Sequence, residues 1–218
     1  MRTILFFCVI CTIIYFCSLS MLHAYVIDFE TGFADLDPVG KVITPKNEVE
    51  FSVIGGDTVF IAKVGDPTTA FYPSDTPEGG SPGSFFLTDH NTVNLGYLIR
   101  FNAKISYLCL DLYDFRDETG PMPEIGDTAT LTTFANTNWT DPVGEYLFTI
   151  VEGLPEGNVE TLSILTPSEP IGSASLIFST GDKGTGIDNI KFTTIPLPTT
   201  FLLFLSGFLG LVGLRKTT

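Results

Sequence analysis

The chain has 218 residues, a formal net charge of −14 and four cysteines, three of which lie within the first 17 positions. All 25 acidic residues fall between positions 28 and 188, and the segment 25–194 carries a net charge of −17. This charge repels phosphate backbones and excludes nucleic acid as a partner. The cysteine positions exclude a disulfide framework.

The N-terminus has the pattern of an export signal. A single cation, Arg2, precedes an uncharged apolar stretch that ends near Ala24, as in secretory signal peptides. We therefore assign residues 1–24 to a signal peptide cleaved after Ala24. Cleavage after Ser20 is an alternative, and so is an uncleaved N-terminal anchor, because the apolar run is long.

Residues 25–194 are predicted to form one all-β domain. Short β-branched and aromatic runs alternate with Gly, Pro, Asn and Asp clusters, and no long segment has helical periodicity. The pattern predicts a jelly-roll-like antiparallel β-sandwich, flanked by an N-terminal signal helix and a C-terminal hydrophobic helix. Strands are expected at 25–30, 48–54, 58–64, 84–89, 94–101, 105–115, 128–134, 146–152, 160–166, 173–179 and 187–193.

Catalytic chemistry has little support in the sequence. The two histidines are isolated: His23 lies in the export segment, and His90 lies in a turn-like cluster. Cys109, within an alternating strand pattern, is expected to be a buried inert thiol. A carboxylate pair drawn from Glu30, Asp111 and Asp114 would suit a glycosidase, but 25 scattered acids make such pairs easy to find. We expect no enzymatic activity.

Aromatic residues in turn-like stretches are candidates for sugar binding. Trp139, the only tryptophan, lies in a polar stretch that ends at Pro142, and an exposed indole face can stack on a sugar ring. Tyr72, in a loop rich in proline and glycine, and Tyr113 are further candidates. The alternative for Trp139 is an aromatic cap on one end of the sandwich.

The two ends of the domain resemble a known fold. Residues 27–33, Ile-Asp-Phe-Glu-Thr-Gly-Phe, and residues 185–192, Thr-Gly-Ile-Asp-Asn-Ile-Lys-Phe, are similar to the first and last strands of galactose-binding-like jelly rolls and carbohydrate-binding modules. In that fold the terminal strands run close together and often share a structural Ca²⁺. The resemblance implies Glu30 and Asp188 as calcium ligands, with Asp28 on the same strand face as Glu30. The alternative is that Asp188 only makes a turn or sheet-end hydrogen bond.

The C-terminus, residues 195–218, has the pattern of an address or an anchor. Pro196-Leu197-Pro198 precedes an uncharged run at 201–214, with glycine at every third position from 207, and Arg215-Lys216 follow. The run is short for a permanent span, which needs ~20 apolar residues. A permanent membrane anchor nevertheless remains the alternative to a processed signal.

This tail resembles the PEP-CTERM protein-sorting signal, with Leu197 where the commonest form has Glu. The resemblance implies recognition by an exosortase-type processing enzyme in a Gram-negative bacterium that makes exopolysaccharide. The protein would be tethered transiently to the inner membrane and then released to the cell envelope or extracellular matrix. We therefore expect an exported, non-enzymatic surface protein associated with exopolysaccharide. A carbohydrate-binding module with specific sugar affinity is the alternative.

Overall fold

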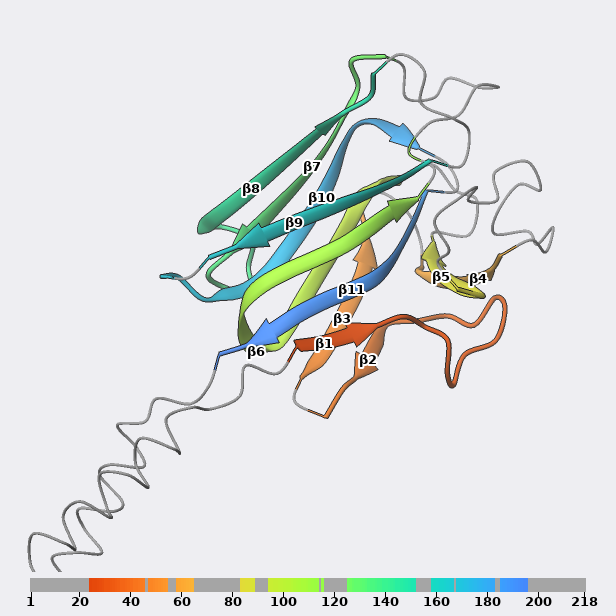
Figure 1. Cartoon of the computed structure of the whole chain (residues 1–218), viewed down its shortest axis with the longest axis horizontal. Coiled ribbons are helices and arrows are strands. Elements are labelled where there is room, and N and C mark those ends of the chain that lie inside the picture. The colour runs from red at the N-terminus through yellow and green to blue at the C-terminus, as the bar shows by residue number, and fades with distance from the viewer. Residues whose placement is uncertain are drawn as a thin grey trace, which may run out of the picture. The chain divides into compact units, whose positions relative to one another are not determined.

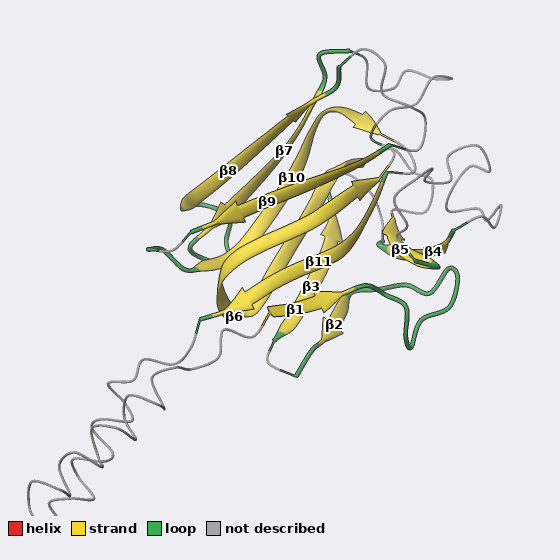
Figure 2. Cartoon of the chain, viewed as in Figure 1, coloured by secondary structure: helices red, strands yellow, loops and turns green. Residues whose placement is uncertain are grey.

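The computed structural model describes residues 24–45, 47–54, 58–64, 83–88, 94–113, 115, 125–151, 158–166, 168–182 and 185–195. These residues form antiparallel β-structure without helices (Figure 2). Residues Ala24–Thr194 make up one compact unit. The expected signal and tail helices lie outside the described residues. Among the residues described, no helix is long and apolar enough to cross a membrane.

Eleven strands make up the unit (Figure 1). They are β1 (Ala24–Ile27), β2 (Lys41–Ile43), β3 (Glu48–Val53), β4 (Phe60–Lys63), β5 (Phe85–Thr88), β6 (Asn94–Tyr113), β7 (Thr128–Phe134), β8 (Pro142–Thr149), β9 (Val159–Leu165), β10 (Ile171–Asp182) and β11 (Gly186–Thr194).

The long strand β6 belongs to both layers of the sandwich. Its first half pairs with β3 on one side and β10 on the other, which extends one layer to β2-β3-β6-β10-β7-β8. Its second half pairs with β11 and β9, and β1 joins at β11. The β4-β5 hairpin joins this second layer at Ile187. Each layer thus receives a different half of the same strand (Figure 1).

The side-chain alternation of β6 changes phase between its two halves. In the first half Tyr97, Ile99 and Phe101 are buried, and in the second half Leu108 and Leu112 are buried. All five side chains join one hydrophobic cluster with residues from both layers. The strand therefore keeps an apolar face toward the common core although it passes from one layer to the other.

The prediction of two strands at 94–101 and 105–115 is wrong, because β6 is continuous between them. Asn47 explains the difference. Its Nδ2 donates to the Ala103 carbonyl at 2.9 Å, and its Oδ1 accepts from the Ala103 N–H at 2.7 Å. The amide thereby replaces a neighbouring strand at the point where β6 changes layers. Strand β2 was not predicted, since three residues give too short an alternation to recognise.

Candidate functional site

An acidic cluster lies where β11 meets β6. Asp188 on β11 is the direct cross-strand partner of Asp111 on β6. Asp188 is fully buried, and neither of its carboxylate oxygens has a hydrogen-bond partner. An unpaired buried carboxylate is costly unless it binds a proton or a cation, so this group needs a partner.

The electrostatics of the cluster favour protonation of Asp188. Burial, together with the charges of Asp28, Glu30 and Asp111, raises its pKa from 3.8 to about 9, although the nearby backbone N–H of Asn189 opposes the shift. A cation at this point would relieve the same unfavourable interactions that raise the pKa.

Asp111, in contrast, is well paired. Thr161 Oγ1 donates to one of its oxygens at 2.6 Å, and Asn189 Nδ2 donates to the other at 3.0 Å. Asn189 adopts a left-handed conformation with φ 48°, at a bulge where β11 shifts register against β6. The bulge therefore sets Asn189 beside Asp111, next to the unpaired Asp188.

Glu30 ties the end of β1 to the start of β5. Its Oε1 accepts the backbone N–H groups of Ser84 at 2.6 Å and Phe85 at 3.1 Å. Gly83 permits this approach: a Cβ there would lie 2.1 Å from Glu30 Oε1. The carboxylate is thus held in place by two charge-assisted hydrogen bonds.

The expectation that Asp28 and Glu30 share a strand face is wrong. Strand β1 ends at Ile27, and Phe29 has a left-handed φ of 53°. Asp28 Oδ1 instead accepts the N–H of Glu30 at 3.3 Å, closing a short turn. Both carboxylates remain close enough to raise the pKa of Asp188.

The fit to Ca²⁺ rests on the two unpaired oxygens of Asp188. Within the described part of the chain, no three His, Cys, Asp or Glu side chains are placed to hold a metal ion together. Calcium takes six to eight oxygen ligands, including backbone carbonyls and water. The residues present therefore suit calcium only if carbonyls or water complete the site around Asp188 and Glu30.

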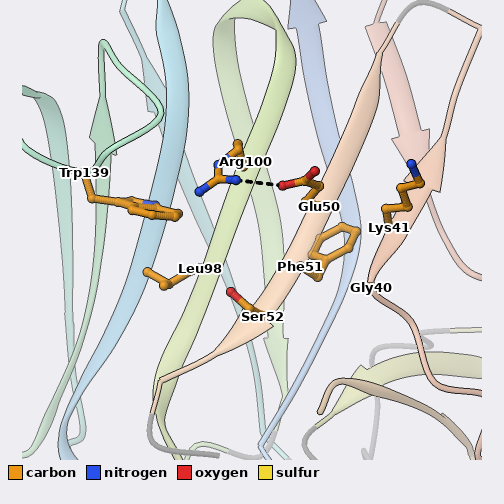
Figure 3. Close-up of a pocket in the computed structure, with 8 residues that line it drawn as sticks. All are labelled: Gly40, Lys41, Glu50, Phe51, Ser52, Leu98, Arg100 and Trp139. Carbon is orange, nitrogen blue, oxygen red and sulfur yellow. Dashed lines mark hydrogen bonds and ion pairs between the residues drawn. The ribbon is translucent and has the colours of Figure 1, made fainter. Parts of the chain in front are cut away.

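A second candidate site lies on the outer face of β3 and β6 (Figure 3). Arg100 on β6 lies between Glu50 on β3 and Trp139 of the β7–β8 loop. Its Nη1 donates to Glu50 Oε2 at 3.0 Å, and its guanidinium carbon lies 4.8 Å from the centre of the indole ring. Together they form a guanidinium sandwiched between a carboxylate and an aromatic face.

Trp139 is anchored to the sheet. Its Nε1 donates to the Ala174 carbonyl of β10 at 3.3 Å, and its φ of 54° is left-handed. The residue is partly exposed and lines a hollow of about 270 Å³. The indole therefore covers part of the outer face of the sheet, and it also forms one wall of an open site.

The other sequence-predicted residues are distributed differently. Tyr113 is fully buried, with its ring against Phe86 and its hydroxyl accepting from Asn189 at 3.3 Å. Burial, followed by the charges of Asp188 and Asp111, raises its pKa. A ring in this position offers no face to a sugar in solution. Tyr72, Asp114 and the sorting residues Pro196, Leu197, Pro198, Arg215 and Lys216 lie outside the described residues.

Arg100 and Glu50 were not predicted as site residues from the sequence. Their cross-strand pairing depends on the register of β3 and β6, and Trp139 is 39 positions away from Arg100 in the chain. The sequence signal that could have identified Arg100 was its position as a cation in an alternating strand of a strongly acidic domain.

Cys109 is buried, as expected, and forms no disulfide.

No protein-family model matches the chain, and no curated protein matches it in sequence. Solved structures resemble it at low similarity. The K1 cleaved adhesin domain of Lys-gingipain from Porphyromonas gingivalis W83 has 11% identity and a TM-score of 0.46, covering 80% of this chain and 99% of that domain.

Two further similar structures are associated with carbohydrates. A family 35 carbohydrate-binding module from Clostridium thermocellum has 16% identity and a TM-score of 0.30, covering 67% of this chain and 99% of the module. The arabinose-bound α-L-arabinofuranosidase MgGH51 has 9% identity and a TM-score of 0.39, covering 82% of this chain and 32% of the enzyme. Likenesses this weak carry no functional argument, so function rests on this chain's own residues.

Proposed function

We propose that this chain is an exported, non-enzymatic surface protein whose β-sandwich associates with polysaccharide through Trp139, Arg100 and Glu50. The observation that carries the proposal is the arrangement of these three side chains around an open hollow. An aromatic wall beside a half-exposed donor and a half-exposed acceptor provides the contacts that sugar rings and hydroxyl groups require.

Two of the three acids considered for a hydrolase, Asp111 and Glu30, have other roles in the structure. Both oxygens of Asp111 accept hydrogen bonds, and Glu30 accepts two backbone N–H groups. Asp114, the third candidate, lies outside the described residues. The roles of Asp111 and Glu30 support structural carboxylates rather than a glycosidase pair, which needs carboxyl groups placed on either side of a bound glycosidic bond.

Affinity gel electrophoresis tests the sugar-binding part. The acidic protein is run through native gels with and without soluble galactomannan, hydroxyethylcellulose, dextran or alginate. At least one polymer should retard the wild type, and Trp139→Ala should restore the mobility. Ser163→Ala, an exposed change on β9, serves as the control. If no polymer retards the wild type, the proposal is wrong.

Export and sorting are part of the same proposal. The signal segment 1–24 supports export, and the tail from Pro196 to Lys216 supports recognition by an exosortase-type enzyme, with a transient inner-membrane tether and release to the envelope or matrix. Mass spectrometry of the mature protein decides between processing and permanent anchoring. Loss of the residues after the Pro-Leu-Pro motif supports processing, and an intact Thr218 contradicts it.

A structural Ca²⁺ near Asp188 and Glu30 completes the proposal. Its role would be to neutralise the buried carboxylate and to join the first and last strands, which already pair along Ala24–Ile27. Thermal unfolding in EDTA and in millimolar CaCl₂ measures its stabilising effect.

A further inference from the structure

The hollow beside Trp139 is one part of a longer groove. A second hollow of about 110 Å³ is lined by Glu48, Asn102 and Thr137 and, like the first, by Glu50 and Arg100. The two hollows therefore adjoin at the Arg100–Glu50 pair. We call the combined depression the Arg100 groove.

The groove follows the strand direction. From β3 it takes Glu48, Glu50 and Ser52, and from β6 Asn102 and Arg100. Side chains two residues apart lie on the same face of a strand. With a rise of ~3.3 Å per residue, the floor extends for about 13 Å between the first and third residues of such a row. This length exceeds a single sugar ring.

One wall of the groove is formed by two residues of the same loop, two positions apart. Thr137 borders the second hollow and Trp139 borders the first, and both come from the loop between β7 and β8. Trp139 is bonded to the Ala174 carbonyl, and Ser173 Oγ donates to the Asn136 carbonyl of the same loop at 2.6 Å. The loop is thus fastened to β10 at two neighbouring residues, Ser173 and Ala174.

Volume favours a ligand that occupies both hollows. Small-molecule sites usually measure ~300–1,000 Å³. The first hollow, at about 270 Å³, lies just below this range, and the second, at about 110 Å³, lies far below it. Only together do they match a typical site.

The charges of the groove favour a neutral ligand. Arg100 is paired with Glu50 at 3.0 Å, and Lys41 with Glu48 at 3.1 Å. The groove therefore has no excess of either sign, in a domain whose charge of −17 repels anionic polymers. A hydroxyl-rich neutral chain avoids this repulsion.

Unused hydrogen-bonding capacity is present beside the pair. Arg100 Nε is buried without a partner, and so is Ser175 Oγ on the neighbouring strand β10, where Ser175 is 3% exposed. Ser175 lies directly opposite Leu98, which lines the first hollow. Hydroxyl groups both donate and accept, so vicinal hydroxyls can accept from the guanidinium while donating to Glu50.

From these observations we infer that the Arg100 groove binds an internal stretch of a neutral polysaccharide chain, lying along β3 and β6 across both hollows. The inference rests on the proposed function and specifies its ligand class. One sugar unit occupies the hollow beside Trp139, and the next units pass the Arg100–Glu50 pair toward Asn102 and Thr137.

Isothermal titration calorimetry tests the inference with manno-, cello- and isomalto-oligosaccharides of one to six units, and with alginate oligomers as the acidic comparison. One neutral series should gain affinity about tenfold between two and four units, as expected for one or two added hydrogen bonds. Asn102→Ala, an exposed change in the second hollow, should remove that gain and leave the disaccharide affinity unchanged. Ser163→Ala should alter neither.

Each unfavourable result of the titrations overturns a different part of the account. Equal affinity for two and for four or more units means a single-ring site, which overturns the extended-chain inference and leaves the proposed function intact. Tighter binding of alginate oligomers overturns the neutral class. Absence of binding to every oligosaccharide and polymer overturns both the inference and the proposed function.

Discussion

Asp188 and Asp111 face each other across neighbouring antiparallel strands, yet only Asp111 has hydrogen-bond partners for its two oxygens. Like charges directly opposite in a sheet destabilise it. With Asp188 fully buried, the pair is tolerable when Asp188 carries a proton or contacts a cation. The stability of the domain should therefore depend on both pH and cations.

In chelator, the wild type should lose stability as pH rises. The pKa of Asp188 is 3.8 in the unfolded chain and about 9 in the folded domain, so the native state holds the extra proton between these values. The stabilisation that protonated Asp188 provides is fully present below about pH 4 and is lost as pH rises toward 9. Between these values the free energy of unfolding falls by up to ~1.4 kcal/mol per pH unit. Urea unfolding with EDTA from pH 6 to 8.5 measures this slope.

Asp188→Asn is the matched variant for that experiment. The amide is neutral at every pH, so the variant should lack the slope and be more stable than the wild type at pH 8.5 in EDTA. Parallel pH profiles for the two proteins would show that Asp188 is already ionised and paired in the cation-free domain.

Calcium should stabilise the wild type at neutral pH. A ligand at 100 times its Kd adds ~2.7 kcal/mol, which for a domain of this size raises Tm by about 5–10 °C. Thermal unfolding in EDTA and in millimolar CaCl₂ measures the shift, and Asp188→Asn should abolish it. An unchanged Tm in the wild type removes the Ca²⁺ proposal, whereas the groove is unaffected.

Glu30→Ala should destabilise the domain even without calcium. It removes the acceptor of the Ser84 and Phe85 N–H groups, and loss of hydrogen bonds to a charged group costs about 1.5–3 kcal/mol. Glu145→Ala, at an exposed site on β8, should stay within about 0.5 kcal/mol of the wild type. Equal losses in urea unfolding would mean that Glu30 does not tie β1 to β5.

Gly96→Ala should be severely destabilising. Gly96 has a φ of 132°, and a Cβ there would lie 1.8 Å from the Leu176 carbonyl oxygen of β10. Backbone strain and the clash should together cost at least about 3 kcal/mol. Gly40→Ala, where a Cβ meets nothing within 4 Å, should be nearly neutral. A stable Gly96→Ala variant in thermal unfolding contradicts the observed β6–β10 register.

Local patterns predicted much of the fold. The strand at 128–134 was placed at its observed bounds, because its alternation of buried and partly exposed residues is regular. Contacts distant in the sequence were not predictable. Asn47 keeps β6 continuous from 56 positions away, and no local pattern reveals that one strand serves two layers.

The same limit applies to the candidate sites: single residues were predictable from the sequence, but the partners that strand pairing brings to them were not. Trp139 was predictable as a single tryptophan in a polar turn, but its partner Arg100 depends on the pairing of β3, β6 and β10. The resemblance drew attention to Asp188, whereas its lack of hydrogen bonds and its pairing with Asp111 depend on the β11 bulge. The turn at Phe29 was missed, because a left-handed conformation is uncommon for an aromatic residue.

The central claim is that polysaccharide binds beside Trp139, and intrinsic fluorescence tests it most directly. Trp139 is the only tryptophan in the chain, so its emission reports on this groove without a label. The wild type is titrated with galactomannan, hydroxyethylcellulose and dextran in turn. Arg100→Met serves as the comparison, because removing a half-exposed ion pair costs only ~0–1 kcal/mol of stability.

We predict a saturable change in emission with at least one of these polymers, and a loss of that response in Arg100→Met although the variant remains folded. Saturable binding of a polymer that leaves the emission of Trp139 unchanged, or no response to any of the three, would contradict the account.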